Sequence, residues 1–204
     1  KWWIQTGADQ KKTISAAGVD EKTRYLIAAY LGIDTENDKE IKLPEITPAD
    51  SAALQQLKEM KVIIRPLTSK SNLLEADLVM VQNAGPSQMV RILEKLSAVK
   101  EQLYRLDASN CTLNNEAIKI IASFTHLSKL EIQGNNLTDD VIQPLSILQE
   151  LVVLNAGQNM FTDKSMAIFK KLASLKKINL WQNRVTEDGL KEFRSQLPGV
   201  VIDL

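Results

Sequence analysis

The sequence predicts an α/β solenoid, in which a curved parallel sheet of about seven strands has helices on its convex side and an N-terminal helical cap before it. Two observations lead to this prediction. Short blocks of alternating apolar residues recur at intervals of 24 residues in the C-terminal half of the chain. Each block is followed by a polar bend and by apolar residues at helical spacing, so each unit is expected to form one strand and one helix.

The polar bend gives the register of the repeat, whose pattern is L-x-x-L-x-L-x-x-N-x-L. Its asparagine-type position recurs every 24 residues, at Cys111, Asn135, Asn159 and Asn183. An asparagine amide at such a bend can bond backbone groups of adjacent coils, so we expect a structural ladder along the solenoid. Cysteine is an accepted alternative at this position, and Cys111 is therefore expected to be a buried structural thiol rather than a nucleophile.

Each bend is followed by a residue that can begin a helix. These residues are again 24 positions apart, at Asn114, Thr138, Thr162 and Thr186. Acidic residues follow them, as in Asp139-Asp140 and Glu187-Asp188, and paired carboxylates can serve acid–base catalysis or cation binding. Because they recur at one phase of the repeat, we favour helix capping, which satisfies the free N–H groups and the dipole of the first turn.

Residues 103–204 resemble the leucine-rich repeat family on the pattern and spacing given above. The 24-residue units of strand and helix are similar to those of its ribonuclease-inhibitor-like and bacterial branches. The resemblance implies a solenoid in which each coil packs its leucines against the next coil.

The coils before residue 103 fit the template less well. One imperfect match would add a further asparagine to the ladder: Glu75, Leu78, Met80 and Asn83. A weaker match precedes it: Leu57, Met60, Val62, Arg65 and Leu67. The step of 18 residues from Arg65 to Asn83 leaves room only for a loop over 68–76, whereas 87–99 can supply a helix. A last strand is expected over 200–203.

Residues 1–56 are predicted to form an N-terminal helical cap and linker, and residues 57–204 the repeat domain, because a repeat array needs a cap on its terminal coil. Helices are expected over 21–31 and from Thr47-Pro48 onward, with an exposed linker between them. The pair Trp2-Trp3 either packs against a neighbouring element or offers a platform for a ligand.

The N-terminal residues carry a second resemblance. The segment 1–8, KWWIQTGA, resembles the closing helix of the c-type cytochrome domain of certain large bacterial membrane proteins, and 43–50, 62–67 and 180–187 resemble segments of their tails. This implies that the chain is the tail of a longer bacterial cell-envelope protein, in the periplasm or on the outer face of the cytoplasmic membrane. An upstream cytochrome-like domain is then a candidate partner. The chain has no C-x-x-C-H motif, so we expect no covalently attached haem in it.

The composition offers few groups for catalysis or ligand binding. Lys and Arg number 25 and balance 25 Asp and Glu, which argues against a nucleic-acid partner. One cysteine and one histidine, His126, leave no disulfide framework and no metal-binding or catalytic motif. The longest apolar run, 25–31, is too short to cross a bilayer, so no membrane insertion is expected. We therefore expect no cofactor, no metal and no enzymatic activity.

The outward residues of the predicted strands are expected to form the concave face, where a protein or peptide partner would bind. They are Arg105, Asp107, Lys129, Glu131, Val153, Asn155, Lys177, Asn179 and Trp181. Two interpretations of this face are open. Its cationic and acidic columns can neutralise each other as an ordinary solvated surface. Alternatively, Trp181 anchors a partner, because exposed aromatic residues on a rigid sheet are typical hot spots.

These observations favour a non-catalytic protein–protein interaction scaffold, because the repeat accounts for nearly every distinctive residue and leaves no catalytic group unused. The alternative is a structural or regulatory tail that docks onto the cytochrome-like part of a larger membrane-bound protein.

Overall fold

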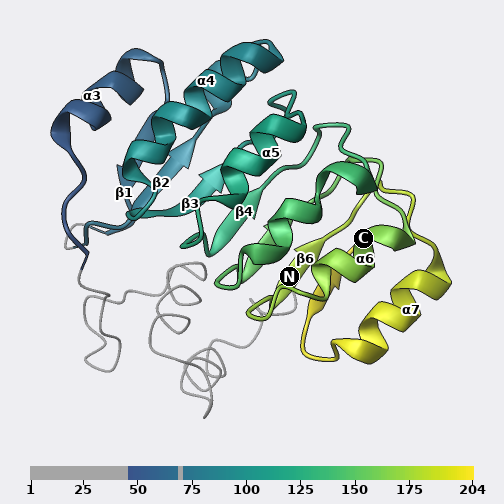
Figure 1. The fold of residues 1–204 in the computed structure, drawn as a ribbon. Helices are drawn as coiled ribbons and strands as arrows, with labels where there is room; N and C mark the ends of the chain where they lie inside the picture. The colour runs from purple at the N-terminus through teal and green to yellow at the C-terminus, as the bar shows by residue number, and fades with distance from the viewer. Residues whose placement is uncertain (1–45, 69–70) are drawn as a thin grey trace. The chain divides into compact units, whose positions relative to one another are not determined.

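The computed structural model describes residues 46–68 and 71–204, and Ile46–Leu204 forms one unit of the chain. Within these residues seven strands form a single sheet in chain order (Figure 1). The strands are β1 (Ile63–Pro66), β2 (Leu74–Asp77), β3 (Leu103–Asp107), β4 (Lys129–Glu131), β5 (Val153–Asn155), β6 (Lys177–Asn179) and β7 (Val201–Asp203). The α-helices are α3 (Ser51–Glu59), α4 (Pro86–Leu96), α5 (Asn115–Ala122), α6 (Asp163–Phe169) and α7 (Glu187–Gln196). Short 3-10 helices are η2 (Val79–Val81), η3 (Ser97–Val99), η4 (Asp139–Val141) and η5 (Gln143–Ile147).

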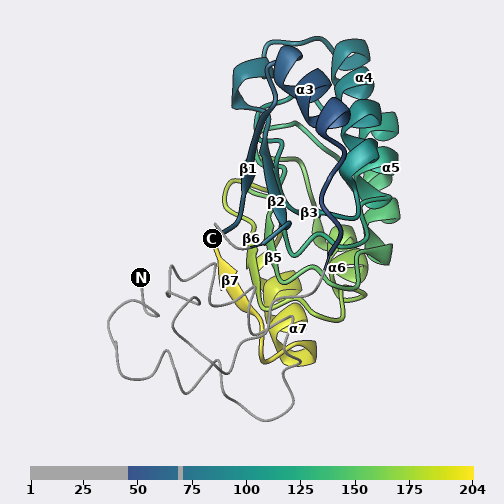
Figure 2. The same ribbon diagram turned by 90° about the vertical axis from the view of Figure 1, so that its left-hand side faces the viewer.

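Among the described residues, helices cover one face of the sheet and none covers the other, which we call the open face; Figure 2 shows this in side view. From β3 onward, neighbouring parallel strands pair residues 24 positions apart, such as Leu106 with Leu130 and Leu130 with Leu154. Each coil therefore contributes one strand and one return segment to two layers. The predicted α/β solenoid is confirmed at this level.

The first strand differs from the prediction of an all-parallel sheet. β1 pairs antiparallel with β2, with Ile64 opposite Ala76. The chain between these two strands is too short for the crossover of a dozen or more residues that parallel pairing requires, so the two strands turn back on each other instead. The predicted loop over 68–76 is also too long, because β2 already begins at Leu74.

The register of β2 corrects the alignment of the imperfect coil that contains Glu75, Leu78, Met80 and Asn83. Ala76 pairs with Leu106, whereas the predicted alignment placed Leu78 opposite Leu106, so that alignment was wrong by two residues. Counting five residues on from each partner, Val81 rather than Asn83 takes the position of Cys111. Asn83 lies exposed in the turn before α4. The prediction that Asn83 belongs to the ladder is therefore wrong, because a spacing of 30 residues between the paired strand positions breaks the 24-residue period.

Helix α3 begins at Ser51 rather than at Thr47-Pro48, because the side chain of Asp50 accepts the N–H of Ala52 and caps the first turn. It runs to Glu59 and buries Ala53 and Leu57. The predicted domain boundary between residues 56 and 57 thus falls inside a helix that packs on the repeats. The other predictions for the cap lie outside the described residues: the helix over 21–31, the linker and Trp2-Trp3.

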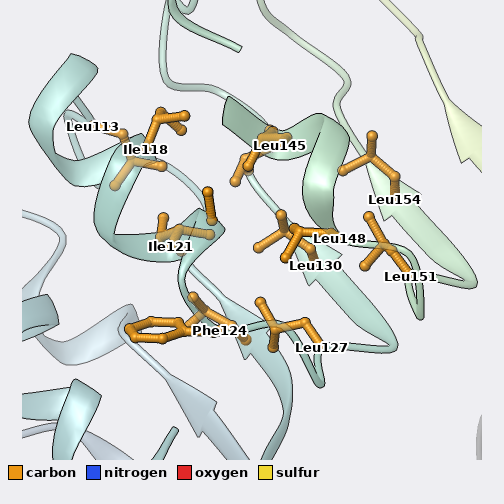
Figure 3. Close-up of a cluster of buried hydrophobic side chains, with 14 of the residues drawn as sticks. Leu113, Ile118, Ile121, Phe124, Leu127, Leu130, Leu145, Leu148, Leu151 and Leu154 are labelled. Atoms are coloured by element: carbon orange, nitrogen blue, oxygen red, sulfur yellow. The ribbon is translucent and has the colours of Figure 1, made fainter. Parts of the chain in front are cut away.

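The core lies between the sheet and the helices. Figure 3 shows it where two coils meet, with Ile118 and Ile121 of α5 and Leu145 of the next coil directed toward the strand residue Leu130. All four side chains are fully buried. Burial of each such aliphatic side chain contributes about 1.5–3 kcal/mol, so the coils are held together mainly by this layer.

One coil replaces the expected helix with two 3-10 turns, η4 and η5, over 139–147. Pro144 explains the difference, because it lacks an N–H and would clash with the preceding turn of a continuous α-helix. The apolar positions Ile142, Leu145 and Leu148 still reach the core.

No helix in the described part of the chain is long and apolar enough to cross a bilayer.

Candidate functional site

An asparagine ladder runs through the bends that follow β4, β5 and β6. Asn135 Oδ1 accepts the N–H groups of Cys111 and Leu113 in the preceding coil, at 2.8 and 3.2 Å. Its Nδ2 donates to the carbonyl of Ala108 in that coil, at 2.9 Å, and to carbonyls of its own bend. Asn159 repeats this pattern one coil later. Each amide thus satisfies buried backbone donors and acceptors of two coils at once.

The asparagine ladder ends in a different residue at its C-terminal and N-terminal coils. Asn183 accepts the N–H of Phe161 at 3.0 Å and donates to carbonyls of both coils, but it is half-buried. At the other side Cys111 is fully buried, as predicted, and its Sγ donates to the carbonyl of Ser109 at 3.3 Å. Burial, together with the charges of Asp107 and Asp77, raises the pKa of the Cys111 thiol to about 12. The thiol is therefore neutral and unsuited to nucleophilic attack.

A second ladder joins the helix starts, and the sequence did not reveal it. Asp139 accepts the N–H and the hydroxyl of Thr162 in the next coil, at 2.9 and 2.7 Å, and also the hydroxyl of Ser165. Asp163 accepts the N–H and hydroxyl of Thr186 in the same way, at 2.8 and 2.7 Å. The pair Asp139-Asp140 was predicted to cap its own helix. Each aspartate lies 23 residues before the next capping threonine, but this spacing follows from the 24-residue period itself and does not mark the aspartates as a ladder.

The threonines also cap their helices as predicted. Thr162 accepts the N–H of Lys164, and Thr186 accepts the N–H of Gly189. Asn114 accepts the N–H of Ala117 at 2.8 Å. At Thr138 no side-chain cap forms, because a 3-10 turn follows it.

The second ladder fixes the charge state of Asp139. Burial alone would raise its pKa, but hydrogen bonds from Ser165 and Thr162 outweigh burial and lower the pKa below its usual value. The carboxylate is therefore ionised in the folded chain, and it is engaged in structure rather than poised for acid–base catalysis.

The open face of the sheet carries the predicted concave residues in two columns. The strand register aligns Arg105, Lys129, Val153 and Lys177 in the first column and Asp107, Glu131, Asn155 and Asn179 in the second. Val153 is only 8% exposed, so its apolar side chain offers little surface to a partner.

Most charges of this face are paired within it. Arg105 lies 3.5 Å from Glu75, Lys129 lies 2.6 Å from Glu131, and Lys177 Nζ lies 2.7 Å from Asp203. Such partly exposed pairs contribute well under 1 kcal/mol each, but they reduce the net charge that a partner would meet. The charged columns thus fit the interpretation of mutual neutralisation.

The second column also shapes the ends of the strands. Asp107, Asn155 and Asn179 each accept, through Oδ1, the N–H of the residue two positions later, at 2.8–3.3 Å. Asp77 does the same on β2. These side chains form Asx turns, so one oxygen of each is engaged in turning the chain.

Trp181 follows the second column and is 48% exposed. It lies in the turn after β6, and its backbone N–H is held by Asn179. The neighbouring coil has Gly157 at the same position, and a side chain on Gly157 would approach the carbonyl oxygen of Trp181. The position next to Trp181 in the row across the sheet therefore carries no side chain.

His126 lies before β4, whereas Cys111 lies in the bend after β3. The imidazole is 3.2 Å from a carboxylate oxygen of Glu101 and 3.2 Å from one of Glu150, and it stacks on Tyr104. The cluster links three successive coils. In the described ranges no group of three or more His, Cys, Asp or Glu side chains is placed to hold a metal ion.

No family model and no curated protein matches the chain. Among solved structures, it is similar to an internalin from Listeria monocytogenes, with 23% sequence identity and a TM-score of 0.44. The match covers 53% of this chain and 30% of the internalin chain. The strand register and the asparagine ladder show a leucine-rich-repeat-like solenoid.

Proposed function

We propose that the chain is a non-catalytic protein–protein interaction scaffold that binds a protein or peptide on the open face of its sheet, at the end near Trp181. The exposed indole supports this proposal more than any other feature. A tryptophan on a rigid sheet can bury a large apolar area at little entropic cost, and such residues dominate binding energies in interfaces.

The residues around Trp181 on the open face would form the polar rim of the binding site. The lysines and arginines of this face are paired with carboxylates, so they add specificity and solubility more than binding energy. Asn179 and Lys177 precede Trp181 on β6 and would contribute polar contacts at the rim.

The test compares the wild-type chain with Trp181→Ala on an array of random hexapeptides. We expect a set of peptides to bind the wild type and to lose at least about tenfold in affinity with Trp181→Ala, because a hot-spot residue contributes more than 1 kcal/mol. The free energy of unfolding should change by about 0.5 kcal/mol or less, since Trp181 is half exposed.

Ile147→Ala is the matched control, because Ile147 is 53% exposed but lies in η5 on the helix side. Equal binding by the wild type and Trp181→Ala would contradict the proposal. A large loss of stability in Trp181→Ala would show instead that the indole has a packing role.

We also propose that the chain has no enzymatic activity and that it lies in the periplasm or on the outer face of the cytoplasmic membrane. The alternative function, a tail docking onto a cytochrome-like domain, predicts binding to that domain that Trp181→Ala leaves intact. Titration of the chain with the separately prepared domain distinguishes the two functions.

A further inference from the structure

One row of residues crosses the open face at the ends of the parallel strands. Each member follows a second-column residue by two positions: Val79, Ser109, Gln133, Gly157 and Trp181. We call this set the end row. In four of the five turns the second-column side chain accepts the N–H of the end-row residue, at 2.8–3.3 Å. The same local geometry therefore presents Val79 and Trp181, although they are far apart in sequence.

The turns of the end row are also joined to one another. Backbone N–H groups of Asn110, Gly134 and Gln158 donate to the carbonyls of Gln133, Gly157 and Trp181, at 2.9, 3.1 and 2.6 Å. On the other side, Gln82 Nε2 donates to the carbonyl of Ser109 at 3.1 Å and ties η2 to the next coil. These hydrogen bonds between neighbouring turns fix the positions of the end-row residues relative to the sheet.

The end row is polar or without a side chain in its middle and apolar at both ends. Ser109 is buried, Gly157 has no side chain, and the half-buried Gln133 accepts a hydrogen bond from Asn155 Nδ2 at 2.8 Å through its side-chain oxygen. Val79 is 48% exposed, as Trp181 is, and the adjacent Met80 is 63% exposed. Four strand spacings separate Val79 from Trp181, which corresponds to about 19 Å along the sheet.

Among the described residues, one carboxylate beside the row has no cationic partner. Asp77 lies 3.8 Å from Arg65, and Glu131 lies 2.6 Å from Lys129. Asp107, between them in the second column, forms no ion pair with any residue of the described ranges. A cation in a bound segment would therefore find its best complement near Asp107, on the side of the row closer to Val79.

We propose that the end row binds an extended peptide segment of about six residues, which places one apolar side chain on Trp181, another on Val79 and Met80, and a lysine or arginine between them near Asp107. This inference rests on the proposed function and specifies its partner. An extended segment fits because about 19 Å is the span of roughly six residues at 3.3 Å each.

The experiment is a positional scan of hexapeptides against four forms of the chain. These are the wild type, Trp181→Ala, the double variant Val79→Ser/Met80→Ser, and Asp107→Asn. The last variant removes the charge but keeps the turn, because asparagine already forms the same turn at Asn155 and Asn179. Ile147→Ser is the control for loss of an exposed apolar side chain.

We expect the wild type to prefer apolar residues at both peptide ends and a cation between them. Trp181→Ala should remove the preference at one end and the double variant at the other, each lowering affinity at least about tenfold. Asp107→Asn should remove only the preference for a cation, at a cost of about twofold to fivefold.

Two results would overturn the inference. If Trp181→Ala abolishes binding while the double variant and Asp107→Asn keep every positional preference, the proposed function survives and the end row is not the site. If no peptide binds the wild type above the level of a heat-denatured sample, both the inference and the proposed function fail.

Discussion

Two ladders join successive coils, and they differ in chemistry because they meet different backbone groups. The asparagine ladder lies in a buried bend that offers both free N–H and free C=O groups, so its side chains must donate and accept. The aspartate ladder lies at helix starts, where the free groups are N–H donors and the threonine hydroxyl. A carboxylate, which only accepts, is sufficient there. Within one 24-residue unit, the ladder residue in the bend is thus an amide, and the ladder residue at the more exposed helix start is a carboxylate.

The largest effect is expected from Asn159→Ala in the buried ladder. The change leaves two N–H groups and three carbonyls without their partner, in a bend where Asn159 is buried. We expect the free energy of unfolding to fall by about 3 kcal/mol or more, measured by urea denaturation.

Asn83→Ala is the matched control for this change and also tests the corrected register. Asn83 is exposed outside the ladder, so its replacement should alter stability by about 0.5 kcal/mol or less. A cost for Asn83→Ala comparable to that of Asn159→Ala would restore Asn83 to the ladder.

Asp139→Asn should have a smaller effect that depends on pH. The folded chain lowers the pKa of Asp139, so the stabilisation is present above the ordinary value of about 4 and is lost as the pH falls through the lower folded value. We expect the variant to lose about 1–2 kcal/mol at pH 7, with the difference from the wild type shrinking below pH about 4.

Urea denaturation at several pH values measures this effect, with Asp140→Asn as the control. Asp140 is the exposed neighbour of Asp139, and its replacement is expected to change the free energy of unfolding by about 0.5 kcal/mol or less. A constant difference between the wild type and Asp139→Asn from pH 7 to pH 3 would show that the charge of Asp139 does not stabilise the ladder.

Gly189→Ala tests the space that the aspartate ladder needs. A Cβ on Gly189 would overlap Oδ1 of Asp163, which holds Thr186 in the next coil. Alanine normally stabilises a helix by about 1 kcal/mol relative to glycine, but here we expect a net loss of about 1 kcal/mol in thermal or chemical unfolding. Gly199→Ala, which adds a Cβ in open space, should be nearly neutral, and a stabilising Gly189→Ala would contradict the close approach.

The smallest effect is expected at the residue that precedes each asparagine of the ladder. Gln158 has a φ of 52°, whereas the equivalent Gly134 has a φ of 69° and no side-chain strain. Gln158→Gly should therefore raise the free energy of unfolding by about 0.5 kcal/mol. Asn110→Gly is the comparison, with an expected change near zero, because asparagine tolerates the left-handed region better than glutamine. Equal gains at both positions would show that backbone strain is not the cause.

Local patterns were sufficient for the regular coils. The alternation around Leu130 and Leu154 predicted strands, and Thr162 and Thr186 predicted helix starts, because strand alternation and helix capping depend on residues a few positions apart. The candidate face followed from the same alternation, which separates Lys129 and Glu131 from the buried residue between them.

Local patterns failed where a contact depends on a second coil. Nothing in the sequence around Asp139 distinguishes a carboxylate that caps its own helix from one that bonds Thr162 in the next coil. The exposure of Val79 and Met80 was likewise hidden, because the irregular step before β3 displaced the alignment of β2 by two residues.

The sequence by itself determined the 24-residue period, the residues that turn the chain and the burial of Cys111, since each follows from side-chain chemistry within one coil. Only the tertiary structure decided the antiparallel pairing of β1, the aspartate ladder and the alignment of Val79 with Trp181 in one row. Those features arise where neighbouring coils meet, and the distance between two coils depends on how the whole core packs.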